Sequence, residues 1–156
     1  MHPNAQLIDK FYTAFAKGDA ERMNACYHDD IVFEDPAFGR LEGDRAKAMW
    51  EMLMSRGKES TTILASNIKA DDKSGSAKWV ANYVYGPKKR KVENRVQASF
   101  EFKDGKIIQH TDVFDLWKWS RQAIGPTGYL LGWSSFMKNK MQKTTEKLLD
   151  TYIKNR

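Results

Sequence analysis

The spacing of apolar residues near the N-terminus predicts a helical hairpin. Apolar side chains recur every three or four positions over residues 4–17, as on one face of an α-helix, at Leu7, Ile8, Phe11, Tyr12 and Phe15. Gly18 would end this helix, and Asp19 would cap a second short helix that runs to residue 27. The same spacing returns after Asp44, which predicts a third helix that ends at Gly57.

The middle of the chain alternates between apolar and polar residues, which predicts strands. A short strand is expected over residues 31–35, after a polar break at residues 28–30 and before Pro36. A loop should follow between Gly39 and Gly43. Further strands are expected over residues 61–70, 76–85, 91–102 and 105–117, joined by turns rich in Gly, Asp and Pro. Three helices followed by a four-strand meander indicate an α+β fold, with a curved antiparallel sheet wrapped around the helices.

The pattern after residue 117 predicts a helical extension. A short helix is expected over residues 118–124, then a loop containing Tyr129 and Trp133, which would form either a lid or a dimer contact. From residue 134 a discontinuous apolar stripe with lysines opposite predicts a docked surface helix. At 156 residues without a linker, the chain is expected to form one domain, 1–156, with a core over about 5–117 and an extension over 118–156.

Composition narrows the function classes. No apolar run approaches the roughly 18 residues that span a bilayer, and no signal segment opens the chain, so we expect a cytoplasmic protein without a membrane partner. Cys26 is the only cysteine and the three histidines are scattered, so we expect no disulfide, metal or other cofactor. The net charge of +6 is concentrated in residues 88–91 and the C-terminal lysines. Because no exposed aromatic platform accompanies them, nucleic-acid binding is disfavoured, and residues 87–92 fit a solvated hairpin better than a nuclear localisation signal.

The last predicted strand carries the candidate chemistry. Period-two spacing places Ile108, His110, Asp112 and Phe114 on one face, with Ile107 on the other. A histidine and an aspartate among apolar neighbours form a candidate acid/base pair, because both pKa values can shift there. The alternative is a purely structural hydrogen bond.

Four junctions resemble those of the nuclear transport factor 2-like superfamily. The resemblance covers about residues 5–117 and rests on residues 11–19, on Phe33-Glu34-Asp35-Pro36, on Gly43-Asp44-Arg45 and on Gly105-Lys106-Ile107. It implies a cone-shaped sheet around a conical pocket. The superfamily includes ketosteroid isomerases, SnoaL-like polyketide cyclases, epoxide hydrolases, dehydratases and non-catalytic binders, so the fold alone does not choose a function.

Matching the site residues one at a time narrows the choice. Asp35 matches the general base of ketosteroid isomerases, but Phe11 and Ala98 stand where those enzymes keep their oxyanion donors, which argues against ketosteroid isomerisation. Asp112 matches the acid/base aspartate of SnoaL-like cyclases, although their histidine comes from a neighbouring strand and His110 does not. The Asp-Arg-Asp arrangement of limonene-epoxide hydrolases is incomplete, because Gln97 follows Arg95.

Six further residues are predicted to line the pocket, although aromatic residues at such spacing also fit a plain core: Tyr12, Trp50, Trp79, Tyr83, Asn94 and Phe114. The sequence therefore predicts an acid/base isomerase, cyclase or hydrolase acting on a small lipophilic molecule through Asp112, His110 and Asp35. The competing hypothesis is a non-catalytic module that binds a hydrophobic ligand or serves assembly. A homodimer through the outer sheet face is also expected, because that face mixes Val80, Val84, Thr111 and Val113 with polar neighbours.

Overall fold

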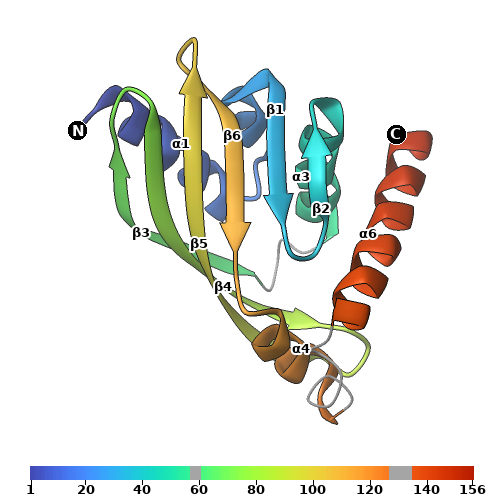
Figure 1. The fold of residues 1–156 in the computed structure, drawn as a ribbon. Coiled ribbons are helices and arrows are strands. Elements are labelled where there is room, and N and C mark those ends of the chain that lie inside the picture. The colour runs from blue at the N-terminus through green and yellow to red at the C-terminus, as the bar shows by residue number, and fades with distance from the viewer. Residues whose placement is uncertain (57–60, 127–134) are drawn as a thin grey trace.

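The computed structural model describes residues 1–56, 61–126 and 135–156 (Figure 1). The predicted helix end at Gly57 and the predicted lid residues Tyr129 and Trp133 lie outside the described residues. The elements are α1 (Pro3–Ala16), α2 (Ala20–Ala25), β1 (Tyr27–Asp35), β2 (Gly39–Glu42), α3 (Asp44–Arg56), β3 (Thr62–Ala70), β4 (Ser74–Tyr85), β5 (Arg90–Lys103), β6 (Lys106–Val113), α4 (Leu116–Ile124) and α6 (Ser135–Asn155). The α+β class is confirmed.

The strands form one sheet in the order β2-β1-β6-β5-β4-β3. The predicted meander from β3 to β6 is antiparallel throughout, which confirms that prediction, while β1 pairs with β6 in parallel, so the six-stranded sheet is mixed and mostly antiparallel. Gly39 to Glu42 is strand β2 rather than loop. β2 has four residues and only Leu41 is buried, so the sequence shows no alternation of apolar and polar residues there. The polar residues 28–30 belong to β1 and lie where its register with β6 shifts.

Helices cover one face of this sheet. Figure 1 shows α1, α2 and α3 behind the strands, with α6 beside α3 at the β2 edge. The main core joins the apolar stripe of α1 to inward residues of the strands, and Leu149 of α6 is buried in it. α6 is also attached to the β1–β2 turn, because Thr145 Oγ1 donates to the carbonyl of Ala37 at 2.8 Å. The predicted docked C-terminal helix is therefore confirmed.

A bulge changes the predicted faces of β6. Phe102 pairs with Ile107 and Glu101 with Gln109, so Ile108 is the extra residue. Ile107 is consequently fully buried while Ile108 is only half-buried, which reverses the prediction for these two residues. Beyond the bulge the alternation is as predicted, and His110 and Asp112 both point inward.

β6 also ends earlier than predicted. It stops at Val113, and the Asp115 side chain accepts a hydrogen bond from the Lys118 backbone at 3.0 Å, which caps α4. α4 packs against β5 and forms a second apolar cluster of Val92, Trp119 and Ala123. Within the described parts of the chain, no helix is long and apolar enough to cross a membrane.

Candidate active site

The inward face of β6 places His110 and Asp112 in the middle of the core. Their exposed fractions are 0% and 3%, and His110 Nε2 lies 2.9 Å from Asp112 Oδ1. Trp79 Nε1 on β4 donates to the same carboxylate oxygen at 3.4 Å. Both hydrogen bonds fall on Oδ1, and no donor among the described residues reaches Oδ2. The buried carboxylate therefore has one oxygen that is held by protein donors and one that is not.

The other nitrogen of His110 is held from β1 and α3. Tyr27 Oη lies 2.8 Å from His110 Nδ1, and Trp50 Nε1 donates to Tyr27 Oη at 2.8 Å. Because the tyrosine oxygen accepts from the indole, its own O–H can donate to Nδ1, which assigns the imidazole proton to Nε2. In the resulting series of hydrogen bonds, from Trp50 through Tyr27 and His110, every donor points toward Asp112. The arrangement suits a neutral histidine beside an ionised aspartate.

Aromatic rings surround the imidazole. The ring of His110 contacts five others, with centroid separations from 4.5 Å to 6.4 Å: Phe11, Tyr27, Phe33, Trp50 and Phe100. Phe11, at the position where ketosteroid isomerases carry a tyrosine donor, stacks on the ring of Tyr27 at 5.4 Å. These walls exclude water, so electrostatic interactions inside them are stronger than at the surface.

Tyr12 of α1 carries an unused donor beside this pair. Its hydroxyl is buried and has no hydrogen-bond partner among the described residues. Burial raises the pKa of Tyr12 well above its usual value, and the nearby charge of Asp112 raises it further. The phenol is therefore neutral and can donate. A buried donor without a partner costs free energy, which makes this hydroxyl a candidate contact for a bound molecule.

Asp35 lies beside Asp112 on the neighbouring strand. Phe33 pairs with His110 and Glu34 with Thr111, so continuing the parallel register places Asp35 opposite Asp112. Asp35 accepts hydrogen bonds from the backbone of Ala37 at 2.9 Å and of Phe38 at 2.6 Å.

The carboxyl group of Asp35 has a raised pKa. The residue as a whole is half-buried, but protein surrounds the carboxyl closely. Desolvation is the main reason that its pKa is raised from 3.8 to about 7, and the charge of Asp112 contributes in the same direction. Asp35 therefore exchanges its proton near neutral pH, while lying outside the hydrogen-bonded chain of His110.

The predicted lining residues divide into two groups. In the first group, Trp79 donates to Asp112, Trp50 reaches His110 through Tyr27, and Tyr12 is close enough for the charge of Asp112 to raise its pKa. Tyr83 lies farther along β4, where its hydroxyl accepts from Trp119 Nε1 at 2.6 Å, and Phe114 packs against both apolar clusters. Asn94 is the half-buried polar member of an inward row that includes Val96, Ala98 and Phe100, as predicted.

Tyr27 is the member of the His110 hydrogen-bond network that the sequence does not predict. The apolar spacing places it at the end of the second helix, whereas it begins β1, and its partner His110 is 83 positions away in the chain. No local pattern marks it, because its contact with the imidazole arises only from the parallel pairing of β1 and β6. The Arg95 side chain, by contrast, is 68% exposed on the outer face and pairs with Glu93 at 2.7 Å.

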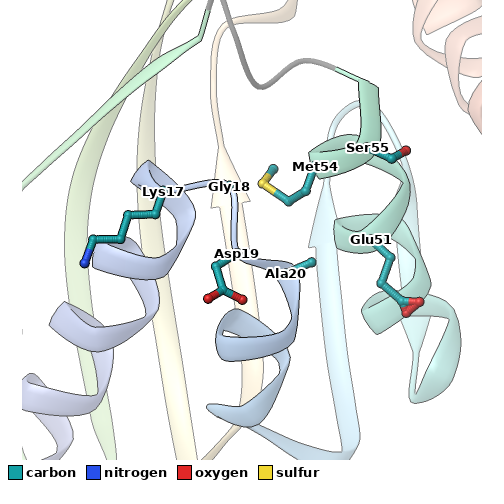
Figure 2. A pocket seen from close by; sticks show the side chains of 7 residues that line it. All are labelled: Lys17, Gly18, Asp19, Ala20, Glu51, Met54 and Ser55. Atoms are coloured by element: carbon teal, nitrogen blue, oxygen red, sulfur yellow. The ribbon is translucent and has the colours of Figure 1, made fainter.

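Two surface cavities lie away from these residues. One, of about 480 Å³, opens between the α1–α2 junction and the end of α3, and Figure 2 shows Lys17, Asp19, Glu51 and Met54 around it. The other, of about 800 Å³, lies between the β4–β5 turn and α4. Neither lining includes any predicted site residue. Within the described residues, no group of three His, Cys, Asp or Glu side chains could hold a metal ion.

Comparisons with known proteins agree with the fold. The epoxide hydrolase EphG of Mycobacterium tuberculosis (strain ATCC 25618 / H37Rv) is 27% identical over 110 residues, which cover 70% of this chain and 72% of that protein. A putative polyketide cyclase from Xanthomonas campestris pv. campestris superposes with a TM-score of 0.63 at 22% identity, covering 77% of this chain and 96% of that one. TerC, co-crystallised with polyporic acid, superposes with a TM-score of 0.62 at 16% identity, covering 72% and 92%. The SnoaL-like domain model matches residues 8–110, and the chain therefore belongs to the SnoaL-like family with its nuclear transport factor 2-like fold.

Proposed function

We propose that this protein is an enzyme that transfers a proton on a small lipophilic substrate, with Asp112 as the base. The observation that carries the proposal is the fully enclosed His110–Asp112 hydrogen bond of 2.9 Å. A general base must lie within hydrogen-bond reach of the proton that it removes, and the buried Asp112 carboxylate has one oxygen, Oδ2, that no donor among the described residues holds. His110 and Trp79 hold Oδ1, which orients Oδ2 toward a substrate.

Tyr12 supplies the matching donor. A substrate carbonyl placed between Tyr12 and Asp112 would lose a proton from its α-carbon to Oδ2, while the electron pair moves onto the carbonyl oxygen. The Tyr12 hydroxyl would then hydrogen-bond the resulting enolate oxygen. Removing a donor of this kind costs about two to three powers of ten in rate in other enzymes.

Asp35 would return the proton. Two carboxylates on neighbouring strands resist being ionised together, and the pKa of Asp35 near 7 lets it donate at neutral pH. Asp112 as base and Asp35 as acid would together complete an isomerisation, or would protonate the product of a ring closure. The remaining predicted lining residues, Tyr83, Asn94 and Phe114, would contact the apolar body of the substrate.

Isomerase or cyclase chemistry is favoured over epoxide opening. The arginine that epoxide hydrolases of this fold use would correspond to Arg95, which lies on the outer face. On the inner face the residue opposite Asp112 is Ala98. The interior of this chain is lined by aromatic rings, which suits a small aromatic or alicyclic substrate, and TerC, a protein of the same fold, was co-crystallised with the small molecule polyporic acid.

The test is a panel of cyclic ketones, polyketide intermediates and epoxides with purified protein. Asp112→Asn should lower turnover by about two to four powers of ten, and Tyr12→Phe by less. Asp30→Asn removes the same charge from an exposed site on β1 and should leave turnover unchanged. Equal turnover in the wild type and Asp112→Asn would disprove the proposed role of Asp112.

One observation favours a second candidate, a non-catalytic binding module. The five rings that contact His110 leave the imidazole itself fully covered, as in a core held together by a buried polar network. Native mass spectrometry of freshly purified protein separates the two. A copurified lipophilic molecule, together with an Asp112→Asn variant that retains it and shows no loss of any activity, would establish binding without catalysis.

A further inference from the structure

The cavity between the β4–β5 turn and α4 is lined almost entirely by cations. We call it the basic groove; its lining residues are Lys88, Arg90, Lys91, Lys118, Arg121 and Gln122, and its volume is about 800 Å³. No carboxylate belongs to that lining. The groove uses the basic run that the sequence singled out and that the proposed active site leaves unexplained. It is therefore independent of the proposed function.

Hydrogen bonds hold this groove in shape. The Gln122 side chain accepts from the backbone N–H of Glu93 at 2.9 Å and donates to the Glu93 carbonyl at 3.1 Å. This pair of hydrogen bonds joins α4 to β5 in the way that a neighbouring strand would. Arg90 Nε donates to the backbone carbonyl of Gln122 at 2.8 Å. Arg121 stacks over the Trp117 ring at 4.1 Å. Both guanidinium groups are thus fixed before any ligand arrives.

Gly125 leaves room for the guanidinium group of Arg90. Its φ is +85°, and a Cβ there would come within 3.0 Å of the Arg90 guanidinium carbon. Any larger residue would be strained in its backbone and would push Arg90 out of place. The position of Arg90 therefore depends on the glycine that follows α4.

The charges of the groove are not balanced from within. Among the described residues, Lys88, Arg90, Lys91 and Lys118 form no ion pair, and the adjacent Glu93 is paired with Arg95 at 2.7 Å on the outer sheet face. These four like charges around one cavity repel one another. An anion with several negative charges would relieve this repulsion.

We propose that the basic groove binds a small molecule that carries two or more phosphate groups. Fixed arginine forks match phosphate oxygens in pairs, and the exposed lysines can close on the remaining oxygens. A volume of about 800 Å³ suits a ligand of nucleotide size.

A longer polyanion fits this surface less well. Single-stranded nucleic acid stacks its bases on exposed rings, and no aromatic residue belongs to the lining of the groove. Trp119 is buried and bonded to Tyr83, and the nearby Tyr85, although 43% exposed, packs its ring against Trp119. The groove is also remote from the acid/base pair, because Arg90 lies eight residues along β5 from Ala98, the partner of Asp112, or about 27 Å at the rise of a strand.

The test compares two triple variants by isothermal titration calorimetry with sodium tripolyphosphate. The groove variant is Lys88→Gln/Lys91→Gln/Lys118→Gln. The control, Lys69→Gln/Lys73→Gln/Lys103→Gln, removes the same charge from exposed positions at the opposite end of the sheet. We expect saturable binding to the wild type and to the control, and affinity lower by about tenfold or more in the groove variant. Amide NMR shifts caused by tripolyphosphate should centre on residues 88–93 and 118–125.

Three outcomes would overturn the proposal. Equal losses in both triple variants would show attraction to net charge only. No saturable binding of tripolyphosphate to folded wild-type protein would remove the site. Binding that appears only with single-stranded oligonucleotides, or only with anionic vesicles, would assign the groove to a macromolecular surface instead.

Discussion

Replacing Asp35 by asparagine should stabilise the protein at alkaline pH and leave it nearly unchanged at acid pH. The pKa of Asp35 is raised from 3.8 to about 7 in the folded protein, so the folded state binds more protons than the unfolded state between these values. The free energy of unfolding of the wild type therefore falls as the pH rises through this window. Below about pH 4 the carboxyl is protonated in both states, and its contribution vanishes.

The magnitude follows from the shift. About three pKa units correspond to about 4 kcal/mol at 1.36 kcal/mol per unit, which is an upper bound because Asp35 is only half-buried. We expect about 2 kcal/mol above pH 7. Asparagine keeps an oxygen that can accept from Ala37 and Phe38, so the turn after β1 should survive the change.

The assay is urea denaturation of the wild type and Asp35→Asn across the range from about pH 4 to pH 8. The difference in unfolding free energy should grow with pH in favour of the variant, while Asp30→Asn, on the same strand but exposed, controls for the loss of one charge. In an Asp112→Asn background the effect should shrink, because one cause of the raised pKa of Asp35 is removed. A constant difference between wild type and variant at all pH values would refute this reasoning.

Three further predictions concern stability and assembly. Tyr27→Phe removes the hydroxyl between Trp50 and His110 and should lower the free energy of unfolding by about 1–3 kcal/mol in urea denaturation, because two buried nitrogens lose a partner; a change below about 0.5 kcal/mol would contradict the network. Gly75→Ala should cost about 1–3 kcal/mol and lower the melting temperature, because its Cβ would meet Ile8 Cδ1 at 2.8 Å and the Lys69 carbonyl oxygen at 2.9 Å; an unchanged melting temperature would show that both groups move aside freely. We also propose a homodimer through the outer sheet face, where Val113 is 61% exposed, and expect Val113→Glu to weaken it. Analytical ultracentrifugation of the wild type at micromolar concentration should show twice the chain mass, and a single species at 18.0 kDa would rule the dimer out.

The elements that the sequence predicted well are those that repeat one period for several turns. The sequence predicts α1, α3 and the strands β3 to β5 within a few residues of their ends. The two helices and the strands β4 and β5 bury residues at a regular period, whereas β3 buries only Ile63 and is delimited by the turn that follows it. β2 and the start of β1 were missed for the opposite reason. β2 buries only Leu41, and residues 28–30 of β1 are polar, so neither segment shows a period long enough to detect. The bulge at Ile108 also leaves no local trace, since it arises from the register with β5.

The candidate site was predictable only where its parts are close in the chain. His110 and Asp112 lie two residues apart on one strand, so alternation alone placed them on the same face. Tyr27, the third member of the hydrogen-bonded chain, depends on pairing across 83 positions. The unpartnered hydroxyl of Tyr12 depends on side-chain packing, which no sequence pattern specifies.

The parallel pairing of β1 with β6 is what turns two separate carboxylates into a candidate acid and base. If β1 and β6 were antiparallel and Phe33 still paired with His110, the residue two positions after Phe33 would lie opposite the residue two positions before His110. Asp35 would then not lie opposite Asp112. The parallel register keeps the two strands in phase, so that both carboxylates lie side by side at the inward face. Their environments then differ. Asp112 receives two side-chain N–H donors on one oxygen, while Asp35 is desolvated and feels the charge of Asp112. A single topological feature thus gives two chemically identical groups different hydrogen-bond partners and brings the carboxyl with the raised pKa, Asp35, next to the proposed base.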